Sequence, residues 1–302
     1  MYKRITIIPV LCLLIAILAC NFPFSTQEVF QVFKHPEQTL TAMFAVLPSA
    51  TVELPVEESG EIQPTGTSEP AETPLIPTPT ISGLERTGQR VTAKYLVSAP
   101  TIDGNWQEWR NLTVVYPSAY VVYGWGNWQN ADDMQASFIL GWDNTYLYVA
   151  VEVEDDKYVQ NSTAEYIYKG DSLEIQMDIN LAADFYTDSL SSDDYQLGIA
   201  PGKGSTSGVK EAYLWYPESQ MGSRTSAVTI ASIGGDGEYR VEVKIPWSVF
   251  GISPHEGMRV GFALSVSDND NAAMNVQQSM VSNIITRMRG DPTTWGELML
   301  IK

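Results

Sequence analysis

Residues 146–154 read YLYVAVEVE, and their side chains alternate in character along the chain. Apolar residues occupy every second position from Leu147 to Val153, whereas the intervening positions end in Glu152 and Glu154. Successive side chains of an extended strand point to opposite faces, so this pattern gives one apolar face. The stretch therefore predicts a β-strand packed on a core through its apolar side.

The same alternation recurs from about residue 90 to the end of the chain. It is clear at 172–178, 239–245 and 259–268, and it is weaker at 91–97, 112–116, 135–140, 195–199, 212–216, 227–233 and 298–301. Turn-forming pairs such as Asp103-Gly104 and Asp143-Asn144 separate these stretches. No amphipathic helical pattern of ten or more residues accompanies them. We expect an all-β fold, a two-sheet antiparallel β-sandwich of the jelly-roll type.

Composition divides the chain before this region. Residues 21–85 contain nine Pro, nine Thr and nine Glu with neither Trp nor Tyr, whereas all eight Trp lie beyond residue 86. Such a segment lacks the apolar surface that offsets the entropy of ordering it, and its Pro-rich parts favour extended structure. We expect a disordered tether over 20–87 and one sandwich domain over 88–302.

The first twenty residues have the features of an export signal. Lys3 and Arg4 precede an apolar run over 5–18, and Ala19 stands directly before Cys20. The order Ile-Leu-Ala-Cys at 17–20 resembles the bacterial lipobox, in which the Cys is lipidated and becomes the first mature residue. The sequence therefore predicts a signal peptide over 1–19 and a lipid anchor at Cys20. The protein is then extracytoplasmic, held at the bacterial cell surface.

Charge and cysteine content exclude several functions. The net charge of −18 argues against nucleic acid and against adsorption to anionic lipid, both of which need clustered Lys and Arg. Cys12 and Cys20 both lie before the folded region, which excludes structural disulfides and thiol catalysis there. His255, in a loop between Pro254 and Gly257, has no neighbouring Cys or His that would indicate zinc. We expect a monomer.

Acidic pairs occur in several expected loops, at 132–133, 155–156, 193–194 and 268–270. The run at 268–271 resembles the start of an EF-hand loop, but Ser279 stands where the bidentate Glu would be, so that motif is rejected. No cofactor is predicted with certainty. Structural calcium held by loop acids stays open.

Aromatic residues gather in polar, Gly-containing loops. Tyr120, Tyr123, Trp125 and Trp128 crowd one loop, and Tyr166 and Tyr168 another. Such rings can cover the ends of a core, and they can also line a small-ligand site. A sugar offers C–H faces to aromatic rings and hydroxyls to polar side chains.

The order of short motifs resembles the family 9 carbohydrate-binding modules, β-sandwiches of the DOMON-like group, over about residues 92–302. The motifs are IDGNWQEW at 102–109, GWDNTYLYV at 141–149, GDSLEI at 170–175, YRVEVKIPW at 239–247, VGF at 260–262 and WGEL at 295–298. The resemblance implies a slot that stacks a poly- or oligosaccharide between two rings.

The resemblance also implies individual site residues. Tyr168 stands where one stacking ring is expected, Glu174 matches a sugar-contacting Glu, and Gln196 keeps the Gln of a Gln-x-Arg pattern whose Arg is Gly198 here. The second ring belongs near 287–291, where this chain has Arg289. Trp125 or Trp128 could supply that second face.

We therefore predict a non-catalytic, surface-tethered carbohydrate-binding protein. A haem or electron-transfer module of the DOMON-like kind and a protein-binding adhesion or scaffold module are the alternatives. Glycosidase activity is the weakest alternative because the chain has no room for a separate catalytic domain.

Overall fold

The computed structural model describes residues 83–109 and 114–302. The predictions for the signal peptide, for Cys20 and for the tether up to residue 82 lie outside the described residues, as do the first two residues of the strand expected at 112–116. Within the described part of the chain, no helix is long and apolar enough to cross a membrane.

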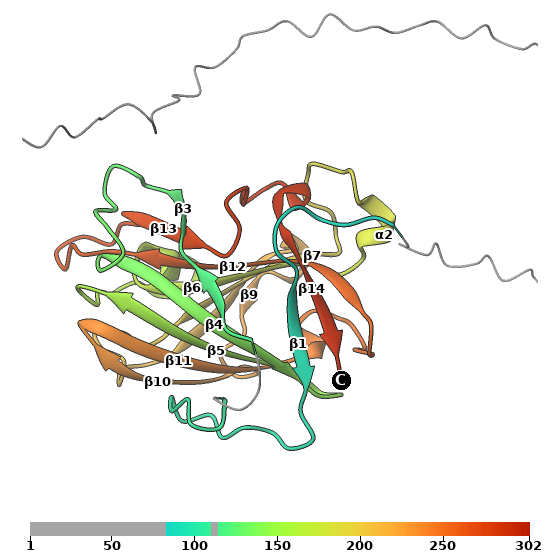
Figure 1. Cartoon of the computed structure of the whole chain (residues 1–302). Helices are drawn as coiled ribbons and strands as arrows, with labels where there is room; N and C mark the ends of the chain where they lie inside the picture. Colours follow the sequence, from blue (N-terminus) through green and yellow to red (C-terminus); the bar gives the residue numbers. More distant parts are fainter. Residues whose placement is uncertain (1–82, 110–113) are drawn as a thin grey trace, which may run out of the picture. The chain divides into compact units, whose positions relative to one another are not determined.

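The described residues form one curled sheet (Figure 1), in the order β10-β11-β5-β4-β1-β14-β12-β6-β7-β8-β9, with β2 paired to β4, and with β13 joining β12 to β3. The strands are β1 Val91–Tyr95, β2 Tyr116–Ser118, β3 Tyr120–Tyr123, β4 Met134–Trp142, β5 Tyr146–Asp155, β6 Ser172–Asp178, β7 Asp194–Ala200, β8 Glu211–Tyr216, β9 Gly222–Ser223, β10 Thr229–Gly235, β11 Gly237–Pro246, β12 Arg259–Asp268, β13 Ser279–Ser282 and β14 Gly296–Ile301. Within residues 83–109 and 114–302, the only regular α-helix is the single turn α2, Leu181–Asp184, and short 3-10 turns lie at η2 Ala164–Lys169, η3 Glu218–Gln220, η4 Trp247–Val249 and η5 Pro292–Thr294.

The all-β sandwich is confirmed, but the prediction of a purely antiparallel sheet is wrong at one strand. β1 pairs in parallel with both β14 and β4, through Val91 opposite Leu298 and Lys94 opposite Gly141. Alternation reports which side chains face the core and is the same for both strand directions. The direction of a strand depends instead on the path of the chain, which places β1 between two strands, β14 and β4, that run parallel to it.

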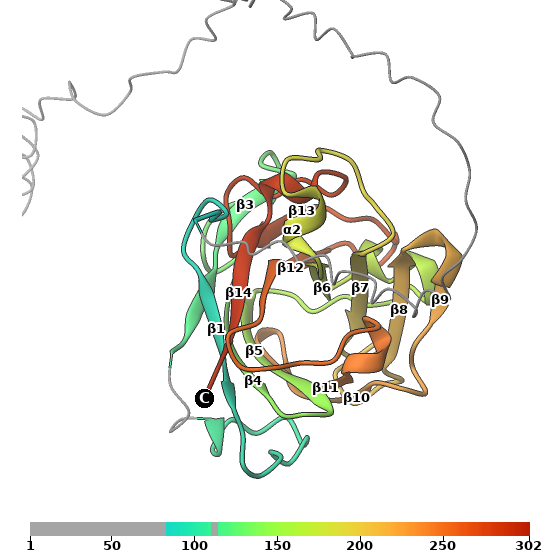
Figure 2. The same ribbon diagram turned by 90° about the vertical axis from the view of Figure 1, so that its right-hand side faces the viewer.

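The curl of the sheet encloses the main core. Figure 2 shows β12, β6, β7 and β8 facing β4, β5 and β11 across the interior. The inward residues of the predicted strands meet there, among them Val149 and Val151 of β5, Leu173 and Ile175 of β6, and Leu264 of β12. The predicted facing of these residues is confirmed.

The other face of β5 is buried as well. Tyr148 and Ala150 form a second cluster with Leu96, Trp106 and Trp109, from the segment that follows β1. Glu242 of β11 lies beneath this segment, fully buried, and three donors bind its carboxylate: Trp109 Nε1 at 2.7 Å, and the backbone N–H groups of Asp103 and Gly104 at 2.8 Å each. One buried acid therefore fixes the whole IDGNWQEW segment on the sheet.

Residues ahead of position 88 also contact the sandwich. Arg86 is buried, its Nη2 lies 3.1 Å from Asp178 Oδ2, and its Nη1 donates to the carbonyl of Phe185 at 2.7 Å. Arg259 Nη2 donates to the carbonyl of Leu84. The packed structure therefore begins within the segment that composition assigns to the tether, because a single charged side chain can be anchored without any apolar pattern.

Candidate functional site

A pocket of about 400 Å³ lies on the face of β6 that points away from the core. Several parts of the fold contribute its lining residues: Val122, Tyr123, Tyr168, Glu174, Trp215, Gln277, Met280, Arg287, Met288 and Arg289. We call it the aromatic pocket. Its volume falls within the range of small-molecule sites.

Glu174 occupies the floor because strand alternation directs it outward between Leu173 and Ile175. Arg287 Nη2 lies 2.6 Å from Glu174 Oε2, and Arg287 Nε donates to Gln176 Oε1 at 2.6 Å. Burial lowers the pKa of Arg287, and the Glu174 carboxylate opposes that shift. The pair is thus a mutually neutralised charge at the base of the pocket, with fixed oxygen and nitrogen positions.

The segment carrying Arg287 and Arg289 is tied to the sheet below it. Gln176 Nε2 donates to the backbone carbonyl of Arg289 at 3.2 Å, and Gln196 Nε2 donates to the same carbonyl. Arg289 Nε donates to Gln196 Oε1 at 3.4 Å. Gln196 therefore lies under the pocket as a support for Arg289, while the exposed Arg289 side chain lines the pocket.

Tyr168 and Trp215 supply the aromatic wall. Tyr168 lies in η2 and Trp215 in β8, with ring centroids 6.1 Å apart and ring planes at 76°. Trp215 Nε1 donates to the carbonyl of Glu165 at 2.8 Å, which fixes the indole. Both rings are only partly buried, so each keeps a face that a ligand can contact.

Gly198 explains why Trp215 fits. It stands on β7, at the position where the sequence resemblance implies an Arg, and a Cβ built there would lie 2.2 Å from Trp215 Cη2. Trp215 is also the extra residue of an irregularity in the β7–β8 pairing, between Leu214 opposite Leu197 and Tyr216 opposite Gln196. The indole thus occupies space that any side chain at position 198 would need.

The opposite end of the pocket is formed by Tyr123 of β3 and Met280 of β13, which pair directly. Four strands, β13, β12, β6 and β7, separate β3 from β8 in the sheet order. Tyr123 is half exposed. The pocket therefore runs across the strands from one ring to the other.

Of the six predicted ligand-binding residues, Tyr168, Glu174 and Arg289 line the aromatic pocket, and Gln196 contacts Arg289. Trp125 and Trp128 do not line it. Trp128 packs against the core and donates from Nε1 to the carbonyl of Met134 at 2.8 Å, and Trp125, 65% exposed, makes a T-shaped contact with Trp128.

Sequence reasoning did not assign Trp215 or Arg287 to the site, and it named Tyr123 only as one ring of an aromatic loop that could line a ligand site. The signal for Trp215 was present, because Ala212 and Leu214 mark the core face of β8 and leave Trp215 on the other. The resemblance points to the segment 287–291, but no comparable signal marks Arg287 itself, whose role depends on which strand its loop crosses.

A site of this composition suits a ligand with both apolar faces and hydroxyls. Exposed ring faces favour C–H surfaces, and the Glu174 carboxylate and the guanidinium groups of Arg287 and Arg289 offer acceptors and donors at fixed positions.

Comparisons with known proteins agree with this geometry. The family model described as carbohydrate family 9 binding domain-like matches residues 102–302. A family 9 carbohydrate-binding module from Caldicellulosiruptor kristjanssonii in complex with cellotriose is 23% identical, with a TM-score of 0.52 over 70% of this chain and 94% of that one. One from the same organism in complex with glucose is 22% identical, with a TM-score of 0.53 over 70% and 95%. No curated protein sequence matches the chain.

The structural likeness establishes the fold, and the family model establishes the kinship, since it covers more than half of the chain. The residues that the family model matches include the motifs that form the core, the segment whose Trp109 donates to Glu242, and the floor of the aromatic pocket. The chain belongs to the carbohydrate family 9 binding domain-like family.

Proposed function

We propose that the protein is a non-catalytic carbohydrate-binding protein that holds an oligosaccharide in the aromatic pocket. The observation that carries the proposal is the meeting of Tyr168, Trp215 and the Glu174–Arg287 pair around one cavity of about 400 Å³. Family membership and the complexes of structural relatives with cellotriose and glucose support the ligand class.

Stacking and polar contacts have separate roles in this proposal. The sugar ring lies against Tyr168 or Trp215 through its C–H face, while its hydroxyls pair with Glu174 and Arg289. Tyr123 limits the length of chain that fits across the pocket, since it lies at the far end. A saturable affinity for a glycan, with no turnover of that glycan, is the expected behaviour.

Removal of either ring tests the proposal. Tyr168→Ala and Trp215→Ala should each weaken glycan binding by about 5- to 150-fold, because loss of a ring contact costs about 1–3 kcal/mol of binding free energy. The ligand is a cello-oligosaccharide or another glycan that the protein binds on an array. Gly198→Ala should weaken binding as well, because its Cβ displaces the Trp215 indole. Isothermal titration calorimetry with matched thermal melts measures both effects.

Matched controls separate the pocket from the rest of the surface. Trp125→Ala removes an exposed ring outside the pocket, and Gly235→Ala adds a Cβ that meets nothing within 4 Å. Both should bind as the unaltered protein does. Normal binding by Tyr168→Ala and Trp215→Ala together with failure of Trp125→Ala would move the site to the 120s loop and overturn the proposal.

We further propose that Cys20 carries a lipid that anchors the chain at the bacterial cell surface, with the Pro-rich segment that follows it as a spacer. The Leu-Ala-Cys order at 18–20 and the Pro-rich composition support it. Cys20→Ser should release the protein to the medium or leave the precursor uncleaved. Detergent-phase partitioning measures the outcome, and Cys12→Ser is the control. Unchanged partitioning of Cys20→Ser would contradict the lipid anchor.

A further inference from the structure

The charges that line the aromatic pocket do not balance. The lining residues include two cations, Arg287 and Arg289, and one anion, Glu174. Arg287 Nη2 lies 2.6 Å from Glu174 Oε2, so these two charges neutralise each other and Arg289 adds a positive charge that the lining does not offset. Because the whole chain carries a net charge of −18, an excess of positive charge in this pocket is a local feature of the site.

Arg289 differs from the other arginines that the structure describes. Five of them form ion pairs with Asp or Glu, namely Arg86, Arg90, Arg240, Arg259 and Arg287. Arg224 donates from Nη1 and Nη2 to backbone carbonyls. Within residues 83–109 and 114–302, Arg289 is the one arginine whose Nη1 and Nη2 both lack a protein acceptor. Its charged end is therefore available to a ligand.

Neighbouring side chains hold the rest of Arg289 in place. Its backbone carbonyl accepts from Gln176 Nε2 at 3.2 Å and from Gln196 Nε2, and its Nε donates to Gln196 Oε1 at 3.4 Å. The side chain is exposed and lines the pocket. What remains for a ligand is the end of the guanidinium, where Nη1 and Nη2 lie in one plane. Two coplanar N–H donors match the two oxygens of a carboxylate.

A second cation lies beside the aromatic wall. Lys169 Nζ is 5.8 Å from the centroid of the Tyr168 ring and 4.8 Å from that of the Tyr166 ring. In the part of the chain that the structure describes, Lys169 forms no ion pair, although Glu165 stands on the same 3-10 turn. Its charge adds to that of Arg289 and favours an anionic ligand at the Tyr168 side of the pocket.

We propose that the aromatic pocket binds an acidic saccharide, with a carboxylate of the sugar paired to Nη1 and Nη2 of Arg289 and a C–H face against Tyr168 or Trp215. The inference rests on the proposed carbohydrate-binding function and names the class of glycan. A uronic acid has both features, because its carboxylate is attached to a ring that offers C–H faces. A neutral sugar would leave the Arg289 charge unpaired, and an inorganic anion would leave the two aromatic rings without a partner.

The acidic surface of the chain opposes this binding only weakly. At physiological ionic strength the Debye length is about 8 Å, so exposed acids farther than that from the ligand are largely screened. Among the residues that line the pocket, Glu174 is the only acid, and Arg287 already neutralises it. The charges inside the pocket therefore decide which glycan binds more tightly.

The test compares two glycans that differ only in one substituent of each sugar. One is cellotetraose, and the other is the same chain with its hydroxymethyl groups oxidised to carboxylates. In calorimetric titrations of the full chain at about 0.15 M salt, the oxidised glycan should bind more tightly. The expected difference is at least about tenfold, equivalent to about 1.4 kcal/mol, because a hydrogen-bonded ion pair replaces a contact with a neutral hydroxyl.

Variants assign the preference to Arg289. Arg289→Gln should reduce it to less than about threefold, because the charge is lost while the contacts of the backbone carbonyl remain. Arg289→Lys keeps the charge without the planar pair of donors and should retain part of the preference. Lys203→Gln is the matched control, since it removes an exposed cation outside the pocket and should keep the full preference. Thermal melts establish that the three variants are folded.

The outcomes distinguish this inference from the proposed function. Equal or weaker binding of the oxidised glycan would overturn the acidic-saccharide inference and leave carbohydrate binding in place, as would array binding to neutral glycans alone. A preference for the oxidised glycan that persists in Arg289→Gln would also overturn it, because the carboxylate would then pair with another group. No binding to any neutral or acidic glycan on the array would overturn both this inference and the proposed function.

Discussion

Glu242→Ala is expected to lower the free energy of unfolding by about 3–6 kcal/mol. The change removes the acceptor for three donors, the indole of Trp109 and the backbone N–H groups of Asp103 and Gly104. Each buried donor left unpaired costs about 1–3 kcal/mol. Chemical denaturation measured by tryptophan fluorescence gives the size of the loss.

Two further variants check the mechanism. Glu242→Gln keeps one acceptor oxygen and should lose less stability than Glu242→Ala. Glu154→Ala, on the neighbouring strand but exposed, should change the free energy of unfolding by less than about 0.5 kcal/mol. A loss in Glu242→Ala no greater than that of Glu154→Ala would show that the segment from Ile102 to Trp109 stays in place without its buried acceptor.

Arg86→Ala is expected to cost about 3–5 kcal/mol, the usual effect of breaking a buried ion pair from one side. The change leaves Asp178 buried without its cation and removes a guanidinium that lies 4.3 Å from the centroid of the Phe185 ring. A chain that begins at residue 88 should show the same loss, whereas one that begins at residue 83 should not.

The loss from Arg86→Ala should depend on pH. Burial raises the pKa of Asp178 to about 6, and Arg86 opposes that rise, so the variant should have a still higher pKa. An acid whose folded pKa is raised holds its proton better when folded, and the folded state loses stability as pH rises through that pKa. The difference between the two proteins should therefore be larger at pH 8 than at pH 5. The double variant Arg86→Met and Asp178→Asn should recover most of the stability that Arg86→Ala loses. A stability difference between the unaltered protein and Arg86→Ala that does not change with pH would contradict the ion-pair explanation.

Local sequence patterns predicted some residues of the binding site but not others. Alternation along β6 places Glu174 on the non-core face, and the motif order adds Tyr168 and Gln196, all of which the structure brings to the aromatic pocket or beneath it. Arg287 could not be found in this way, since its pairing with Glu174 joins residues 113 positions apart. Trp215 is an intermediate case. The alternation along β8 predicts that its side chain lies on the non-core face, but the sequence does not show which residue of the neighbouring strand lies beside it.

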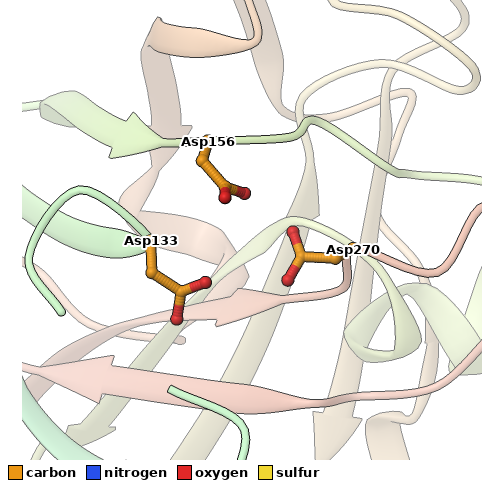
Figure 3. A group of neighbouring side chains, drawn as sticks. All are labelled: Asp133, Asp156 and Asp270. Atoms are coloured by element: carbon orange, nitrogen blue, oxygen red, sulfur yellow. The ribbon is translucent and has the colours of Figure 1, made fainter. Parts of the chain in front are cut away.

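The acidic residues Asp133, Asp156 and Asp270, which lie next to the ends of three strands (Figure 3), make the same distinction more sharply. Each acidic pair stood in a predicted loop, yet nothing near Asp133 in the chain indicates that Asp270 lies beside it. Their meeting depends on β4 pairing with β5 and on the curl of the sheet that brings the end of β12 to them.

The sequence by itself determined the strands and the side of each strand that faces the core, because a period of two residues is a local property of an extended backbone. The order of its short motifs determined the family. Tertiary structure alone decided the parallel pairing of β1, the place of the Trp215 ring over Gly198, and the convergence of acids from three strand ends. These features depend on contacts between residues far apart in the chain, where register and closure of the sheet set the neighbours.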